Sequence, residues 1–268
     1  MALLGALILF ALIAPVFGAP DKIYGNGISA HGLPLPFGSA GHVFGTDSIG
    51  RDMLARLAYG GRTTLEFTFI SNVTSIGLGA VVGVTAGFLR GTTEMVLMRI
   101  TEIFLSVPTV ISGLALASVV GEGVFGVIVV VTALYWAWTA RVVFGETLAL
   151  RRRTFVEAAV AQGVPSTTIM RRHIVPHLSS LLLVIAALNG AAVVAIGAGL
   201  SYLGAGVQPP TAEWGAMIND GQNALQYAPH EVVEPLICIV LTVLSFVLIG
   251  DGIARRGSVS LRRSWLDI

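Results

Sequence analysis

The sequence predicts an all-α membrane protein with six transmembrane helices, and three observations support this fold class. Hydrophobic residues make up 54% of the 268-residue chain, 12% are charged, and the mean hydropathy is +0.83. A soluble domain carries about a quarter charged residues. The apolar residues gather in runs that approach or exceed the roughly 20 residues a helix needs to cross a bilayer. One long polar insert, rich in arginine at its start, separates two of these runs.

Six apolar runs are the predicted spans: Ala2–Gly18, Thr64–Leu89, Val96–Val120, Val124–Leu148, Leu178–Gly204 and Pro235–Ile253. The first is the shortest, and a cleaved signal peptide is its alternative interpretation. It lacks a basic start, and Phe17 and Gly18 stand where an A-x-A pattern precedes cleavage. The missing basic flank also leaves open a start upstream of Met1. The expected parts are a first helix (1–18), an outer segment (19–63), a five-helix core (64–254) and a tail (255–268).

Arginine in the short loops predicts the orientation of the chain. Arginines follow the second run and occur in the polar insert and the tail, whereas residues 121–123 and 205–234 contain no Lys or Arg. Both termini and the insert are therefore expected in the cytoplasm. The outer segment is an exception, with Lys22 and three arginines. Its second half, Asp47–Tyr59, is predicted to form a short interfacial helix in which Arg51 and Asp52 make local pairs.

The interiors of the predicted spans contain small and polar residues. Gly79, Gly83 and Gly87 recur every four residues, a spacing that predicts close helix packing. The fifth run is rich in small residues, which suit either a tight helix crossing or a pathway wall, and its candidate pathway residues are Asn189 and Ser201. Six ionisable residues lie near the predicted span ends, where their side chains reach the interface: Glu66, Glu94, Arg99, Glu102, Arg141 and Glu146. A proton-driven carrier would need a chain of buried carboxylates or histidines, which the spans lack.

The basic residues argue against a nucleotide site in this chain. Of 16 basic residues only Lys22 is a lysine, and it follows Asp21 rather than the glycine of a P-loop. Any ATP and its Mg²⁺ are therefore expected on another subunit, and no cofactor is expected here. His173 and His177 have a zinc-like i, i+4 spacing but no third ligand. No catalytic constellation emerges, and a net charge of +1 gives no reason to expect nucleic-acid binding.

The polar insert, Thr154–His177, is predicted to form two short helices. Thr154 and Glu157 have the T-x-x-E spacing of a capping box, and alanines follow. Gly163 is expected to end the first helix. The second helix is expected to start at Pro165 and to end at about Pro176.

The outer loop at 205–234 combines turn residues with two aromatic side chains. Ala216–Gln226 could form one amphipathic helix on the membrane surface. Trp214 and Tyr227 are interpreted either as anchors at the membrane interface or as substrate contacts.

The insert resembles the EAA loop of ABC-importer permeases. The loop pattern places its residues in register with Glu157, Ala158, Ala159, Gly163 and Pro176, and RHIVP follows the RHI-x-P variant of the peptide and nickel branch. Three further segments are similar to that branch: His42–Leu65, Gly206–Met217 and Gly250–Gly252. The resemblance covers roughly residues 1–253. The group it is most similar to is the second permease subunit of dipeptide, oligopeptide and nickel importers.

This resemblance implies a type I ABC-importer permease of MetI-like fold in a bacterial inner membrane. The implied partners are a homologous permease in a heterodimer, two ATPases and an extracytoplasmic binding protein, within membrane lipid. The five EAA-loop residues would couple to an ATPase, and Gln208, Trp214 and Gly215 would face the binding protein. Peptides are the favoured solute. Nickel, another small solute, or a scaffold or sensor role without transport are the alternatives.

Overall fold

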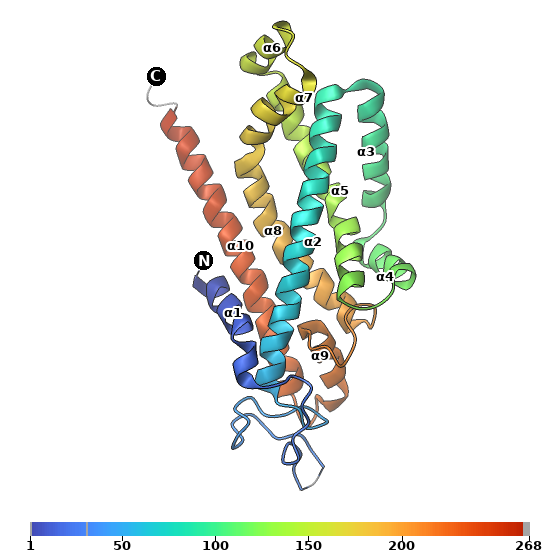
Figure 1. Ribbon diagram of the computed structural model, residues 1–268, viewed down its shortest axis with the longest axis vertical. Coiled ribbons are helices and arrows are strands. Elements are labelled where there is room, and N and C mark those ends of the chain that lie inside the picture. The colour runs from blue at the N-terminus through green and yellow to red at the C-terminus, as the bar shows by residue number, and fades with distance from the viewer. Residues whose placement is uncertain (1, 31, 265–268) are drawn as a thin grey trace. The chain divides into compact units, whose positions relative to one another are not determined.

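A computed structural model describes residues 2–30 and 32–264, with side chains in the last helix described as far as Arg255. Side chains of the basic tail residues Arg256, Arg262 and Arg263 lie outside the described residues. The described chain is helical, with isolated β-bridges between residues 23 and 52. Its helices are α1 (Ala2–Leu12), α2 (Met53–Leu89), α3 (Gly91–Ser106), α4 (Thr109–Val120), α5 (Val124–Arg151), α6 (Thr154–Ala161), α7 (Ser166–Ile169), α8 (Val175–Tyr202), α9 (Trp214–Gly221) and α10 (His230–Ser264) (Figure 1). Short 3₁₀ helices occupy Ala14–Phe17 and Gln222–Ala224, and a π turn occupies Met170–Ile174.

The chain folds into two compact units that share its long helices. The first unit comprises Met1–Ile70, Gly113–Val131 and Gly190–Phe246, and the second comprises Ser71–Ser112, Thr132–Asn189 and Val247–Ile268. The boundary between the units falls inside α2, α4, α5, α8 and α10. The insert and the outer loop therefore belong to different units, the insert to the second and the outer loop to the first.

Among the described residues, four helices have the length and composition of a membrane span: α2, α5, α7–α8 and α10. A fifth is present if α3 and α4 count as one span, although they are bent by 97°. The predicted span Val96–Val120 is therefore not one continuous helix but is divided by this bend. Val107, the residue before Pro108, is extended (φ −100°, ψ 135°), because the proline ring disfavours helical backbone in the preceding residue.

The first predicted span takes the form of a short helix followed by a 3₁₀ turn. The 11 residues of α1 rise about 17 Å at 1.5 Å per residue, less than the roughly 30 Å of a hydrocarbon core. Pro15 lies in the first turn of the 3₁₀ helix that follows, where its missing N–H is tolerated. The predicted spans therefore correspond to four or five helices of sufficient length and this shorter apolar helix.

The start of α2 also differs from the sequence-based expectation. Asp47–Tyr59 does not form a separate interfacial helix, because α2 begins at Met53 and continues through Gly60 and Gly61 to Leu89. Arg51 makes a local pair with Asp47, four residues away, and Asp52 pairs with His42 at 2.8 Å. Both pairs lie in the irregular segment before α2, where they hold the loop backbone at the start of the helix.

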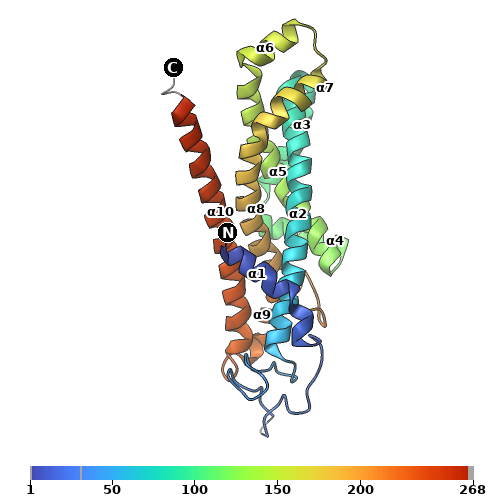
Figure 2. The same cartoon turned by 60° about the vertical axis from the view of Figure 1, so that its left-hand side comes forward.

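In the second unit, α2 packs closely on α5 along the glycine ridge (Figures 1 and 2). A Cβ atom at Gly79 would lie 2.6 Å from the Trp136 carbonyl oxygen, and one at Gly83 would lie 2.6 Å from the Ala140 oxygen. A Cβ at Gly87 would meet Thr147 at 2.8 Å. The predicted close packing is confirmed, because no larger side chain fits between these backbones.

Three of the six ionisable residues assigned to span ends lie inside α3 and α5. Arg99 and Glu102 lie in the second half of α3, and Arg141 lies ten positions before the end of α5 at Arg151. At 1.5 Å per residue, Arg141 is about 15 Å from that end. α5 runs three residues beyond Leu148, and α3 begins five residues before Val96. That these three side chains reach the membrane interface stays a prediction.

Candidate functional site

The first helix of the insert, α6, begins one residue earlier than the sequence pattern suggests. Arg153 is the N-cap residue, with extended backbone (φ −78°, ψ 141°) and no side-chain hydrogen bond to the helix. The predicted capping box is wrong, because Thr154 is already in the first helical turn. A tight turn leads from α5 into α6, with the Arg153 N–H donating to the Leu150 carbonyl at 3.0 Å. Glu157 lies in the first turn, where a negative charge is stabilised by the helix dipole.

Gly163 ends α6 as predicted, through a Schellman motif. The Gly163 N–H donates to the Val160 carbonyl at 3.0 Å, and the Val164 N–H donates to Ala159 at 3.1 Å. Gly163 has a φ of +75°, a left-handed conformation that glycine adopts without steric cost. The sharp change of direction after α6 therefore depends on this one residue.

The second helix of the insert does not end near Pro176. It runs from Ser166 through the π turn at Met170–Ile174 and continues as α8 to Tyr202. Pro176 lies at the second position of α8. The wider π turn accommodates the proline, which lacks an N–H and crowds the carbonyl four residues earlier. The insert is thus joined without a break to a membrane-spanning helix.

The EAA residues divide between two faces of α6. Ala159 is 7% exposed, and with Val156 it packs into a core that includes Ile169 and Ile174. Glu157 and Ala158 are exposed, as are Gly163 and Pro176. Glu157, Ala158 and Gly163 therefore share the outer surface of the insert, whereas Ala159 attaches α6 to its own chain. At the start of α6, the Phe155 ring stacks on the His177 ring, with centroids 4.8 Å apart.

A hollow of about 370 Å³ lies beside the exposed face of α6. Glu157, Val160 and Ala161 line one side, and Arg151 and Arg152 line another. Arg90, from the turn between α2 and α3, completes this basic rim. Arg90 is one of the arginines that follow the second apolar run, and nothing in the local sequence pattern predicts its place near Glu157. The result is an exposed hollow lined by a carboxylate, three guanidinium groups and apolar side chains.

The outer loop is organised around a buried carboxylate that the sequence analysis missed. Glu213 is the N-cap of α9, and its oxygens accept hydrogen bonds from the Ala216 N–H at 2.9 Å and the Thr64 hydroxyl at 3.0 Å. Burial raises the pKa of Glu213, and these hydrogen bonds oppose the shift. In the sequence, an acidic residue directly before a helix was the only local signal for this N-cap. The burial of Glu213 involves Thr64, which is 149 positions away in the chain.

The three outer-loop candidates occupy different environments. Trp214 is 1% exposed, and its indole N–H donates to the Leu57 carbonyl at 2.9 Å. A Cβ at Gly215 would lie 2.1 Å from the Ala198 oxygen. Gln208 is half-buried and donates to the Gly204 carbonyl at 2.8 Å. The expected surface helix at Ala216–Gln226 is wrong, because α9 spans Trp214–Gly221 and buries most of its residues in the first unit.

The two candidate pathway residues both make hydrogen bonds inside the chain. Asn189 is 2% exposed and donates to the Ser75 hydroxyl at 3.1 Å and to the Asn72 side chain at 3.2 Å. These contacts join α8 to α2 within the second unit, and polar pairs of this kind hold membrane helices together. Ser201 is also buried, and its hydroxyl accepts the Val207 N–H at 3.1 Å.

Relatives and a solved structure share this architecture. The family model described as binding-protein-dependent transport system inner membrane component matches residues 79–261. The chain is 34% identical to the oligopeptide transport system permease protein OppC of Haemophilus influenzae, over 94% of this chain and 81% of the relative. It is 35% identical to the glutathione transport system permease protein GsiD of Pectobacterium atrosepticum, over 80% and 71%.

A chain of the MetNI methionine ABC transporter, solved in an inward-facing conformation, is 22% identical and superimposes with a TM-score of 0.63, covering 76% of this chain and 97% of that chain. This likeness supports the MetI-like helical fold. The family match covers most of the chain and includes the insert with its exposed α6 face. The protein belongs to the family of binding-protein-dependent transport system inner membrane components and is a permease subunit of an ABC importer.

Proposed function

We propose that this permease subunit forms half of a translocation pathway for short peptides and couples it to separate ATPases through Thr154–His177. The similar relatives are named as oligopeptide and glutathione permeases, and both of those solutes are peptides. The second half of the pathway comes from a homologous permease, in a pseudo-symmetric heterodimer. ATP and Mg²⁺ bind to the two ATPase subunits, so this chain is not itself an enzyme.

One observation carries the coupling proposal: α6 is exposed on one face and anchored on the other. Glu157 and Ala158 face outward, where an ATPase groove can accept a helix with little side-chain bulk. On the opposite face, Val156 and Ala159 pack in one core with Leu178 of α8 and Val143 of α5. A movement of the ATPase groove is thus passed to two spans as a rigid-body shift. Gly163 and Pro176 shape the connection that carries it.

The outer loop is assigned to an extracytoplasmic substrate-binding protein. We assign Gln208 and the exposed residues around it to that contact, because Gln208 is partly accessible on the outer loop. Trp214 and Gly215 act from inside by holding the loop in shape. In this arrangement both termini and α6 are cytoplasmic, in agreement with the arginine distribution.

The coupling role is tested with two exposed alanines in the complete transporter. Ala158→Tyr adds bulk to the outer face of α6, whereas Ala254→Tyr adds the same bulk to an exposed position of α10. Neither change overpacks the chain itself. We expect Ala158→Tyr to abolish both peptide uptake and the ATPase stimulation by loaded binding protein, while Ala254→Tyr retains both. Equal activity of the two variants would contradict the coupling role.

The same preparation separates transport from a scaffold or sensor role. A transporter co-purifies with ATPases whose turnover rises with loaded binding protein, and labelled peptide accumulates inside proteoliposomes. A sensor subunit would show stimulated turnover without accumulation. Accumulation of nickel in place of peptide would assign the other solute class.

A further inference from the structure

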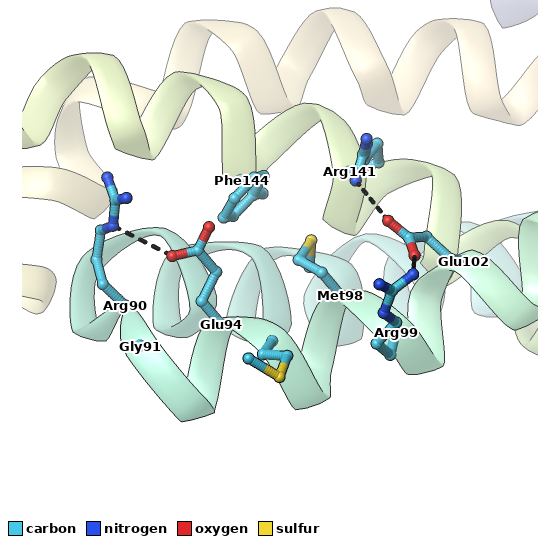
Figure 3. Close-up of a pocket in the computed structure, with 9 residues that line it drawn as sticks. Arg90, Gly91, Glu94, Met98, Arg99, Glu102, Arg141 and Phe144 are labelled. Carbon is cyan, nitrogen blue, oxygen red and sulfur yellow. Dashed lines mark hydrogen bonds and ion pairs between the residues drawn. The ribbon is translucent and has the colours of Figure 1, made fainter.

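A charged hollow on α3 and α5 lies outside the insert and has Arg90 in common with the hollow beside α6. Its volume is about 440 Å³, and it is lined by Arg90, Gly91, Glu94, Met95, Met98, Arg99, Glu102, Arg141 and Phe144 (Figure 3). All nine residues belong to the second unit. Positions 94, 95, 98, 99 and 102 recur at helical spacing, which places them on one face of α3. Arg141 and Phe144 face them from α5.

The charges in this hollow form one pair, Arg90 with Glu94 at 3.1 Å, and one shared network. Glu102 is shared between two arginines, with its oxygens 2.9 Å from Arg99 and 3.5 Å from Arg141 (Figure 3). The side chains of Arg99, Arg141 and Glu102 are 77%, 52% and 44% exposed. Exposed pairs of this kind are weak and exchange partners readily. A solute with its own charges can therefore replace one partner.

The depth of these residues identifies the kind of surface they form. Arg141 lies about 15 Å from the end of α5, a helix with the length and composition of a membrane span. Charged side chains at that depth face a water-filled cavity or a protein partner rather than lipid. The volume of the hollow and the high exposure of its charges are those of a surface in contact with water.

We propose that this hollow is a solute-contacting part of the pathway, in which Glu102, Arg99 and Arg141 transiently bind solutes that carry both an ammonium and a carboxylate group. The inference rests on the proposed function. A solute carboxylate pairs with Arg99 and Arg141, while the solute ammonium pairs with Glu102. A short peptide in its zwitterionic form has both groups.

The charge balance of the hollow disfavours a bare metal ion. Three arginines face two glutamates, so the lining carries a net positive charge. Within the described part of the chain there is no group of three or more His, Cys, Asp or Glu side chains that could hold a metal. The hollow therefore favours a peptide over free nickel.

Water access is tested first, in the assembled transporter. Glu102→Cys is made in a Cys238→Ala background, which removes the natural thiol, and is labelled with a membrane-impermeant thiol reagent. We expect rapid labelling in the complete complex and slower labelling when the solute peptide is in excess. A thiol that reacts in the isolated chain but not in the complex would place this face in the permease–permease interface and overturn the proposal.

Charge recognition is tested with Glu102→Gln and Arg141→Gln, and with Arg255→Gln as control. Arg255 is an exposed arginine that pairs with Asp251 outside the hollow. We expect peptide uptake per ATP hydrolysed to fall about tenfold in the two hollow variants, the effect of losing one hydrogen bond to a charged group. The control, and Arg141→Lys, should stay near the wild type.

The two tests distinguish failure of this inference from failure of the proposed function. If ATPase stimulation by loaded binding protein persists in all variants but their uptake is equal, the hollow does not contact the solute. If wild-type uptake and stimulation are both absent, the proposed function itself fails.

Discussion

At the scale of single residues, the role of Gly163 follows from its lack of a side chain. Its φ of +75° is strained for residues with a Cβ, yet no atom lies within 4 Å of the position a Cβ would take. We expect Gly163→Val to cost about 1–3 kcal/mol of local stability and to abolish stimulated uptake while the protein still inserts. Gly163→Asn should be tolerated better, because asparagine visits the left-handed region more often. Uptake and membrane abundance of both variants check this, and normal transport by the valine variant would remove the bend from the mechanism.

The buried carboxyl group of Glu213 leads to a prediction about how the stability of the protein depends on pH. Burial holds its pKa above the ordinary value of a glutamate in the folded state. Above that ordinary value the unfolded chain loses a proton that the folded chain keeps, so stability decreases as pH rises through this window. The melting temperature in detergent should therefore fall as the pH rises above the ordinary pKa of a glutamate, and Glu213→Gln should weaken that dependence. Glu122→Gln, at an exposed glutamate, is the control; an unchanged slope in Glu213→Gln would assign the effect to another group.

At the scale of elements, the close contact between α2 and α5 depends on glycines, which have no side chain. Gly83→Ala places a methyl group against the Ala140 carbonyl oxygen, and we expect it to destabilise the protein by about 1–3 kcal/mol. Gly77, on the same helix, is exposed with nothing within 4 Å. Gly77→Ala should be neutral or stabilising by about 0.5–1 kcal/mol, through lower entropy of the unfolded chain. Thermal unfolding in detergent compares the two, and equal melting temperatures would mean that the helices move apart freely.

Several element boundaries were predictable, and others were not, for identifiable reasons. Gly163 ends α6 as the sequence indicated, because a Schellman motif involves only neighbouring residues. The capping box predicted from Thr154 and Glu157 does not form. The turn from α5 into α6 leaves Arg153, not Thr154, as the extended N-cap residue. The continuity of α7 with α8 was also missed, because only a π turn allows helix to pass Pro176.

At the scale of the whole molecule, the energy source separates this permease from an ion-coupled carrier. In proteoliposomes that contain ATP and the complete transporter, peptide uptake should continue when a protonophore collapses the proton gradient, and should stop when ATP is removed. Labelled peptide retained on filters measures both conditions. The expectation follows from the absence of a buried chain of carboxylates along the predicted spans. Collapse of uptake at constant ATP would instead support proton coupling.

By itself, the sequence determined the helical membrane class, the position of the polar insert and the residues on it that match the EAA loop. These depend on composition, on helical period and on contacts within a turn or two of the chain. Tertiary structure alone decided which insert residues face outward, the burial of Glu213 and Trp214, and the gathering of Arg99, Glu102 and Arg141 in one hollow. Each of these depends on residues far apart in sequence, such as Trp214 and Leu57, whose meeting is decided by helix packing.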